Sequence, residues 1–325
     1  MNHRAVTFVY ALFSILTLAP STALFAEERA VVPGESLQSA IELASSGDVL
    51  VLQVGTYSGN IDFLGKAITV RGEGRRTIIR GDGTGSVVTF QNGEGADSIL
   101  DSVRITGGLA DEGGAIFISN SSPRILRNFI IRNQARDSGS AIYGEGATSA
   151  PYIANNFIFR STRAPGGDDP HAIQIVGGTP TIVNNTIVRA DSNGIHVSGG
   201  SAAVITNNII FDNGTESGFR RGRGICDFND VGETVMQYNL FSRNILGAIL
   251  HGDAGNFKRM TAAEREIGSE IVSNNIDRNP RFRRVTRGQF KKKTPITNAG
   301  DPNLLNPDGS RSHIGHTGGP DAFGN

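Results

Sequence analysis

A repeated segment of about 20–30 residues is the feature of this sequence that most restricts its fold. Four copies align, and they begin at Ala115, Ala141, Ala172 and Gly194. Each holds a short alternating strand, a turn rich in Gly, Ser or Pro, a second strand ending in Asn, and a third strand. Degenerate copies begin at Ser86 and Gly224. The strands are too short and too closely spaced for helical crossovers, so the pattern favours stacked coils over a βαβ sheet.

Two residue positions keep the same place in successive copies. The first is an Asn: Asn128, Asn156, Asn185, Asn208 and Asn239, with Ser102 at this place in the earlier copy. The second is apolar and lies two residues further on: Ile130, Ile158, Ile187, Ile210 and Phe241. Stacked amides can bond to one another along an axis, while the apolar residues stack in a core. The sequence therefore predicts an all-β solenoid, a right-handed parallel β-helix.

The ends of such a solenoid expose open sheet edges, which need covering. Residues 36–46 predict an N-terminal capping helix, with Ser36 as its N-cap and Gly47 at its end. Thr261 and Glu264 form a capping box, which predicts a second helix in a small insertion. We expect one domain over residues 27–325, with the cap at 27–50, the helical insertion at 256–270 and a C-terminal coil ending at 294–325.

The first 26 residues resemble a secretory signal peptide. Arg4 precedes a mainly apolar run from Ala5 to Leu18, and small residues follow it. We therefore expect a secreted or periplasmic, that is extracytoplasmic, protein. The run is short for a membrane span and no later stretch is apolar enough, so we expect no membrane span in the mature form. Cys226 is the single cysteine, so no intrachain disulfide can form.

Charge is balanced overall but uneven along the chain. The sequence has 31 Lys and Arg residues and 31 Asp and Glu residues, and this balance does not indicate a nucleic-acid partner. Residues 278–293 are strongly basic and contain no acidic residue. Such a segment suits an acidic polymer, although a solvated surface accounts for it equally well.

One side chain per coil should point outward from the first strand of each repeat. These residues are Phe117, Tyr143, Gln174, His196 and Cys226. Aromatic rings stack on the C–H faces of sugars while amides bond to their hydroxyl groups, so the first four are candidate sugar-binding residues. The alternative is a surface ladder that is stabilised by its own stacking.

The turn that precedes this strand is acidic in every copy, with Asp111, Glu112, Asp137, Asp168, Asp169 and Asp191. Stacked coils would hold neighbouring carboxylates about 5 to 10 Å apart. Those separations bracket the carboxylate pairs of glycosidases. The catalytic candidates are therefore Asp137, Asp168, Asp169 and Asp191, with His171 as an acid or base. No cofactor is required, and Asp111, Asp137 and Asp168 are candidate ligands for Ca²⁺.

Arginines recur four residues after the ladder Asn, at a turn that we expect to lead into the acidic loop. They are Arg132, Arg160, Arg189 and Arg243, and Asp212 replaces the arginine in one coil. Arginine grips carboxylates bidentately, so Arg132, Arg160 and Arg189 are candidate ligands for acidic sugars. The alternative is that turn acids and arginines neutralise one another.

Longer motifs carry a resemblance to a known group. The opening ESLQSAIELASSGDVLVLQVGTY, the GKAITVRG after it and the repeated GGAI…NSSP…NN…N pattern resemble the bacterial right-handed β-helix proteins of the pectin lyase-like superfamily. The ending TPITNAGDPNLLNPDGSRSHIGHTGGP resembles a recurrent coil ending, usually with an acidic residue where His313 stands. Pectate lyases of this fold pair Ca²⁺-binding acids with a catalytic Arg, and polygalacturonases use clustered Asp residues. Neither local motif is present, so the resemblance implies the fold and assigns no catalytic residue.

These observations predict a monomeric β-helix protein that binds, or binds and cleaves, a polysaccharide or cell-surface glycan along a lateral groove. An acidic sugar is favoured, and an enzyme of this kind would be a polysaccharide lyase or a glycoside hydrolase. Two alternatives stay open, a structural or adhesive cell-surface rod and a periplasmic accessory factor.

The third strands carry a further apolar row, Ile131, Phe159, Val188 and Phe211. Exposed rows of this kind need a cover. We therefore predict that the C-terminal tail or the Thr261 insertion packs over them.

Overall fold

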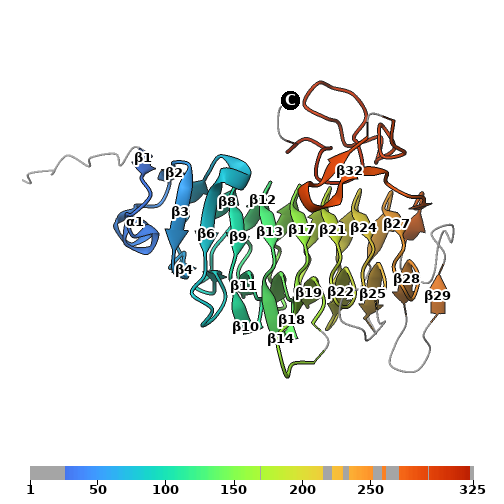
Figure 1. Cartoon of the computed structure of the whole chain (residues 1–325), viewed down its shortest axis with the longest axis horizontal. Helices are drawn as coiled ribbons and strands as arrows, with labels where there is room; N and C mark the ends of the chain where they lie inside the picture. Colours follow the sequence, from blue (N-terminus) through green and yellow to red (C-terminus); the bar gives the residue numbers. More distant parts are fainter. Residues whose placement is uncertain are drawn as a thin grey trace, which may run out of the picture.

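The protein is a rod of stacked coils (Figure 1). The computed structural model describes residues 26–168, 170–214, 222–229, 234–251, 258–260, 271–291 and 293–322. Three long sheets run along the rod, and each coil contributes one strand to each sheet. The predicted signal peptide, most of the predicted insertion and its Thr261 helix lie outside the described residues.

The strands of the first sheet follow one another along the rod in chain order. They are β1 (Glu28–Val31), β2 (Val49–Leu52), β5 (Thr69–Arg71), β8 (Ile99–Asp101), β12 (Arg124–Leu126), β16 (Tyr152–Ala154), β20 (Thr181–Val183), β23 (Val204–Thr206), β26 (Val235–Gln237) and β30 (Ile271–Ser273).

The second and third sheets are built in the same way. The second holds β3 (Gly55–Ser58), β6 (Thr77–Arg80), β9 (Arg104–Thr106), β13 (Phe129–Ile131), β17 (Phe157–Phe159), β21 (Thr186–Val188), β24 (Ile209–Phe211), β27 (Leu240–Ser242) and β31 (Ile276–Asp277). The third holds β4 (Ile61–Asp62), β7 (Val88–Phe90), β11 (Ile116–Ser119), β15 (Ile142–Glu145), β19 (Ile173–Val176), β22 (Ile195–Ser198), β25 (Ile225–Phe228), β28 (Ile249–His251) and the antiparallel β29 (Lys258–Met260).

The remaining strands form two smaller sheets. β10 (Leu109–Glu112), β14 (Gln134–Ser138) and β18 (Thr162–Arg163) form one of them, and β32 (Phe282–Arg284) and β33 (Gln289–Phe290) form the other. The 3-10 turns are Gly74–Arg76 and Val285–Arg287.

The predicted apolar stack is confirmed. Ile130 pairs in register with Ile158, and the pairing continues through Ile187 and Ile210 to Phe241. All five side chains are buried in one core cluster. Because coils in register place like residues above one another, each aliphatic side chain packs on its counterpart in the next coil.

The Asn ladder is also confirmed. The backbone N–H of Asn156 donates to Asn185 Oδ1 at 3.0 Å, and that of Asn185 donates to Asn208 Oδ1 at 2.8 Å. The Asn185 amide also reaches back, because its Nδ2 donates to Ile153 O in the preceding coil at 2.8 Å. The side chain of each ladder Asn thus bonds to the preceding coil. The backbone N–H of each Asn from Asn128 to Asn239 bonds to the following coil, so the ladder extends to Asn275.

One residue of the predicted ladder is wrong. Val103 takes the place assigned to Ser102, since the Val103 N–H donates to Asn128 Oδ1 at 3.1 Å. Ser102 has a φ of 55° and matches Arg127, whose φ is 54°. Because this copy lacks an Asn at the ladder position, the sequence alignment places it one residue too early.

Each coil turns through bends in the left-handed region. One row of bends precedes the second sheet and includes Arg127, Asn155, Asn184 and Asn207. The other follows it and consists of Arg132, Arg160, Arg189, Asp212 and Arg243. The strands therefore end before these arginines, as predicted, and the arginines lie at a corner instead of pointing into the core.

The helix α1 spans Leu37–Leu43 and lies at the N-terminal end of the rod (Figure 1). Ser36 is its N-cap, and the Ser36 Oγ accepts a hydrogen bond from the Ser39 N–H at 3.1 Å. Leu37 and Ile41 are buried in the main core. The helix ends at Ala44, before Gly47, and Lys66 Nζ donates to the carbonyls of residues 41, 42 and 44.

The C-terminal tail packs on the outer face of the second sheet, as predicted (Figure 1). We call the described residues from Phe282 to Ala322 the C-terminal cover. Ile296 and Ile314 of the cover share an apolar cluster with Ile131, Phe159, Val188 and Phe211. The predicted coil ending, from residue 294 onward, therefore lies along the side of the rod.

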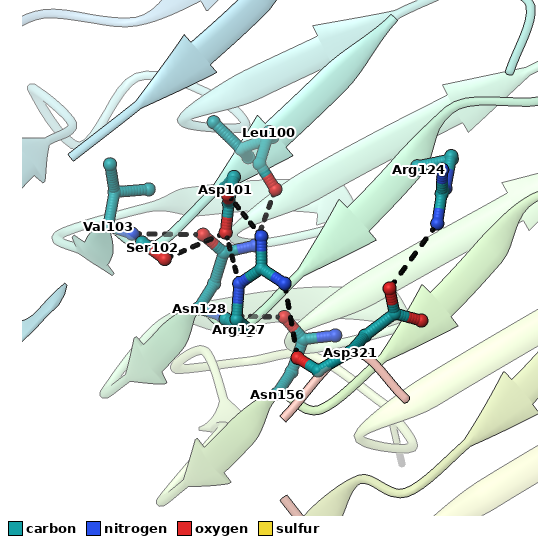
Figure 2. A network of polar contacts seen from close by, with 9 residues as sticks. All are labelled: Leu100, Asp101, Ser102, Val103, Arg124, Arg127, Asn128, Asn156 and Asp321. Atoms are coloured by element: carbon teal, nitrogen blue, oxygen red, sulfur yellow. Dashed lines mark hydrogen bonds and ion pairs between the residues drawn. The ribbon is translucent and has the colours of Figure 1, made fainter. Parts of the chain in front are cut away.

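Polar contacts fasten the end of the cover (Figure 2). Arg127 donates to Asp101 through Nε at 2.9 Å and to the Asp321 carbonyl through Nη1 at 3.1 Å. Asp321 also lies 3.5 Å from Arg124 and accepts a hydrogen bond from the Tyr152 hydroxyl at 2.8 Å. Asn184, at a left-handed bend before the second sheet, also holds the cover, because its Nδ2 donates to the His313 carbonyl at 2.8 Å.

We expect Asn185→Ala to lower the free energy of unfolding by about 2–4 kcal/mol, because it removes the side-chain partners of the buried Asn156 N–H and of the Ile153 carbonyl in the preceding coil. Urea denaturation measures the change. Asn303→Ala is the matched control, because Asn303 is exposed and its side chain makes no hydrogen bond within the described part of the chain. Equal stability of the two variants would show that the amide ladder does not hold the coils together.

Candidate functional site

The outward row of the third sheet has the predicted register but little exposure. Phe117, Tyr143, Gln174, His196 and Cys226 pair from coil to coil. The rings of Phe117 and Tyr143 stack with centroids 5.9 Å apart. Tyr143 is only 6% exposed and His196 only 7%, and burial raises the pKa of the Cys226 thiol to about 12. Only Phe117 and Gln174 of this row are partly exposed, so the row offers little surface to a sugar.

Acidic side chains surround Tyr143. Its hydroxyl donates to Glu145 Oε2 at 3.3 Å. Burial raises the pKa of Glu112, and the negative charges of Glu145 and Asp137 raise it further. A raised carboxyl pKa is the direction of shift that a general acid needs. This face is therefore rich in carboxyl groups, which disfavour the approach of a polyanion.

The other predicted acids are dispersed. Asp111 pairs with Arg136 at 2.8 Å, whereas Asp137 and Asp168 are exposed. Asp191 is buried, and its Oδ2 accepts a hydrogen bond from the Arg163 N–H at 2.8 Å. Asp169 lies outside the described residues.

These positions bear on the predicted calcium site. Within the described part of the chain, no three His, Cys, Asp or Glu side chains are grouped so that they could hold a metal ion. Asp111, Asp137 and Asp168 are therefore not assembled as ligands, and calcium binding stays a prediction.

His171 and His196 stack on each other with ring centroids 4.4 Å apart. Burial lowers the pKa of His171 well below its usual value, and His196 lowers it further. Burial alone lowers the pKa of His196 to about 4. Both rings are therefore neutral at pH 7. A neutral imidazole with so low a pKa is a poor proton donor and a weak base, so this environment does not favour the acid–base role predicted for His171.

The arginine corner divides into two parts. Towards the C-terminal end, Asp212 lies 2.9 Å from Arg189 and 3.2 Å from Arg243. The guanidinium carbon of Arg160 lies 5.5 Å from the centre of the Phe159 ring. Charge neutralisation, the alternative left open by the sequence, therefore applies to Arg189 and Arg243.

Towards the N-terminal end, Arg132 lies in a different environment. Together with Arg80 and Arg104 it lines a recess of about 450 Å³, which we call the corner recess. Asp82 also lines it, but its Oδ1 already accepts hydrogen bonds from Thr84 Oγ1 at 2.6 Å and Asn60 Nδ2 at 2.9 Å. The recess therefore presents an excess of positive charge.

Arg104 is the most constrained of the three arginines. Burial lowers the pKa of its guanidinium, and the neighbouring charges of Arg80 and Arg132 lower it further. Its Nε is buried and has no hydrogen-bond partner among the described residues. A buried donor without an acceptor costs stability, so the site is suited to an incoming anion.

Arg80 and Arg104 were absent from the predicted site, although the sequence holds a signal for them. In TIIR and VRIT, apolar residues alternate with Arg80 and Arg104. The alternation turns both arginines outward once Ile79 and Ile105 are assigned to the core, where the structure places them.

Comparison with known proteins agrees with this architecture. Residues 77–259, more than half of the 325-residue chain, match the family model described as "Right handed beta helix region". The structure is similar to that of the pectate lyase Pel9A, with 14% identity, a TM-score of 0.56 and coverage of 89% of this chain and 96% of that chain. An alginate lyase from Paenibacillus sp. str. FPU-7 has 18% identity, a TM-score of 0.42 and coverage of 71% and 83%, respectively. At 14% identity the first likeness establishes the fold alone.

No curated protein matches the sequence. Among the described residues, no helix has the length and apolar character needed to cross a membrane.

We expect the protein to lose stability as the pH falls below 6.5. Burial lowers the pKa of His196 from 6.5 to about 4 and that of His316 to about 3, and His171 shifts in the same direction. The unfolded chain therefore binds more protons than the folded chain between these values, and stability present above pH 6.5 is lost on acidification. Glu112, whose pKa is raised, opposes this trend as a single group.

Urea midpoints at pH 7.5, 6 and 4.5 measure the effect, and His196→Gln should make the slope shallower. Equal midpoints at all three pH values would contradict the neutral, buried state of these histidines.

Proposed function

Because the chain belongs to the right-handed β-helix family, its stacked coils bring side chains from distant parts of the sequence together on one surface, and we propose that such a cluster binds an acidic polysaccharide outside the cytoplasm. The binding site is the corner recess of Arg80, Arg104 and Arg132. The observation that carries the proposal is the buried Arg104 Nε, which has no acceptor among the described residues.

The arrangement of charges supports an anionic ligand. The three arginines come from three successive coils, those of β6, β9 and β13. They hold different places in the register, since Arg80 pairs with Thr106 and Arg104 pairs with Ile78. The cations therefore form a cluster across neighbouring coils, which can meet successive carboxylates of a polyuronate chain. Arginine binds a carboxylate through two parallel N–H donors, and such charge-assisted bonds are stronger than neutral ones.

Negative charge on the face of the third sheet disfavours binding of the same ligand there. Glu112, Asp137 and Glu145 gather around Tyr143, and the aromatic row there is largely buried. A polyuronate would meet like charge on that face and unlike charge at the corner recess.

Binding tests the proposal most directly, by affinity electrophoresis of the wild-type chain in gels that contain polygalacturonate, alginate or neutral dextran. We expect the two polyuronates to retard the protein and dextran to leave it unaffected. Arg104→Gln and Arg132→Gln should each raise the Kd for the polyuronates about tenfold or more, because each removes a charge-assisted hydrogen bond. Higher salt should weaken it further.

Arg76→Gln is the matched control, since Arg76 is exposed, pairs with Glu73 and lies outside the recess. Urea denaturation of every variant verifies the fold. Absorbance of unsaturated uronates and assays of reducing ends, run on the same samples, report a lyase or hydrolase reaction. Equal retardation of Arg76→Gln and Arg104→Gln, or none of the wild type, would refute the proposal.

A further inference from the structure

A second recess, of about 480 Å³, lies where the C-terminal cover meets the second sheet, and we call it the junction recess. Arg75 and Phe129 line it from the body of the rod. Arg283, Arg287 and His316 line it from the cover. No Asp or Glu is among the described residues that line it.

In the part of the chain that the structure describes, no acidic side chain pairs with Arg75. Its guanidinium carbon lies 4.3 Å from the centre of the Phe129 ring and 5.4 Å from that of Phe157. Its Nη1 donates to the Thr286 carbonyl at 3.4 Å, which is a long hydrogen bond. Its Nη2 is buried and has no partner among the described residues. The guanidinium therefore keeps an unused donor.

Like charges surround this group. Burial, together with the smaller effect of the charges of Arg104 and Arg287, lowers the pKa of Arg75 to about 10. Arg75 belongs to the body and Arg287 to the cover, so their repulsion acts across the junction. An anion between them would change this repulsion into attraction on both sides.

The cover wall of the recess packs closely on the second sheet. The His316 N–H donates to Thr186 Oγ1 at 3.1 Å, and its Nδ1 lies 2.9 Å from the same hydroxyl. Burial lowers the pKa of His316 to about 3, so its ring is neutral at pH 7 and adds no further positive charge to the recess. Gly288 has a φ of 61°, and a Cβ there would lie 2.7 Å from the Phe157 ring. The wall thus packs directly on the sheet and holds its arginines near Arg75.

We propose that the junction recess binds an oxyanionic group, a sulfate, phosphate or carboxylate, between Arg75 and Arg287, and that the bound anion fastens the cover to the rod. Planar guanidinium groups match the oxygens of such anions, and the free Arg75 Nη2 is a donor for one of them. The anion is either a free inorganic ion or an acidic group of a polymer. This proposal does not depend on binding at the corner recess.

Isothermal titration of the full chain with sodium sulfate, in a constant background of sodium chloride, tests the free ion. Titration with a sulfated and with a uronate oligosaccharide tests the polymer group. We expect Arg75→Gln and Arg287→Gln each to weaken binding at least tenfold. Arg287 is exposed, so that replacement should leave folding intact. Arg76→Gln is the matched control.

Arg132→Gln separates the two sites, because it alters the corner recess and should leave anion binding at the junction unchanged. The anion should also raise the thermal unfolding midpoint of the wild type more than that of Arg75→Gln. Because sulfate stabilises both proteins non-specifically, the difference between them reports binding at the recess. Binding of sulfate identifies a free ion as a sufficient ligand, and binding of an oligosaccharide alone identifies the polymer group. Absence of binding by all three, or equal binding by Arg75→Gln and the wild type, overturns the proposal.

Discussion

The hydrogen bonds between stacked Asn amides fix the register on which the rest of the molecule depends. Asn156, Asn185 and Asn208 each bond to the coil before and the coil after. A slip of one residue would move every side chain of a strand to its opposite face. The ladder therefore does more than satisfy buried polar groups, because it ensures that the aliphatic core residues and the surface residues each form continuous rows.

The same geometry brings the charged groups together. Left-handed bends end the strands of the second sheet and place Arg132 at a corner, beside Arg80 and Arg104 of the preceding coils. The C-terminal cover packs on the outward apolar rows of the second sheet. It adds Arg283 and Arg287 to the same side of the molecule. Arg104 connects the two recesses, since its charge acts on Arg75 and it also lines the corner recess.

The sequence predicts those features that repeat with the coil. The Asn ladder, the core stack and the need for a cover could be read from periodicity alone, and the structure has all three. Features that depend on packing between distant segments could not be predicted. One such feature is the burial of His196, whose ring packs against His171 and Phe228. The approach of Arg287 to Arg75 requires the cover to fold back along the rod.

The central claim is that excess positive charge at the corner recess selects an anionic glycan. An NMR titration of ¹⁵N-labelled arginine side chains with an oligogalacturonate observes the Nε–H groups themselves. We predict that the Arg104 Nε–H resonance shifts with added ligand, because this buried donor acquires an acceptor, while that of Arg76 stays unchanged. Shifts confined to Arg136, beside the acidic face, or no shift at saturating ligand would contradict it.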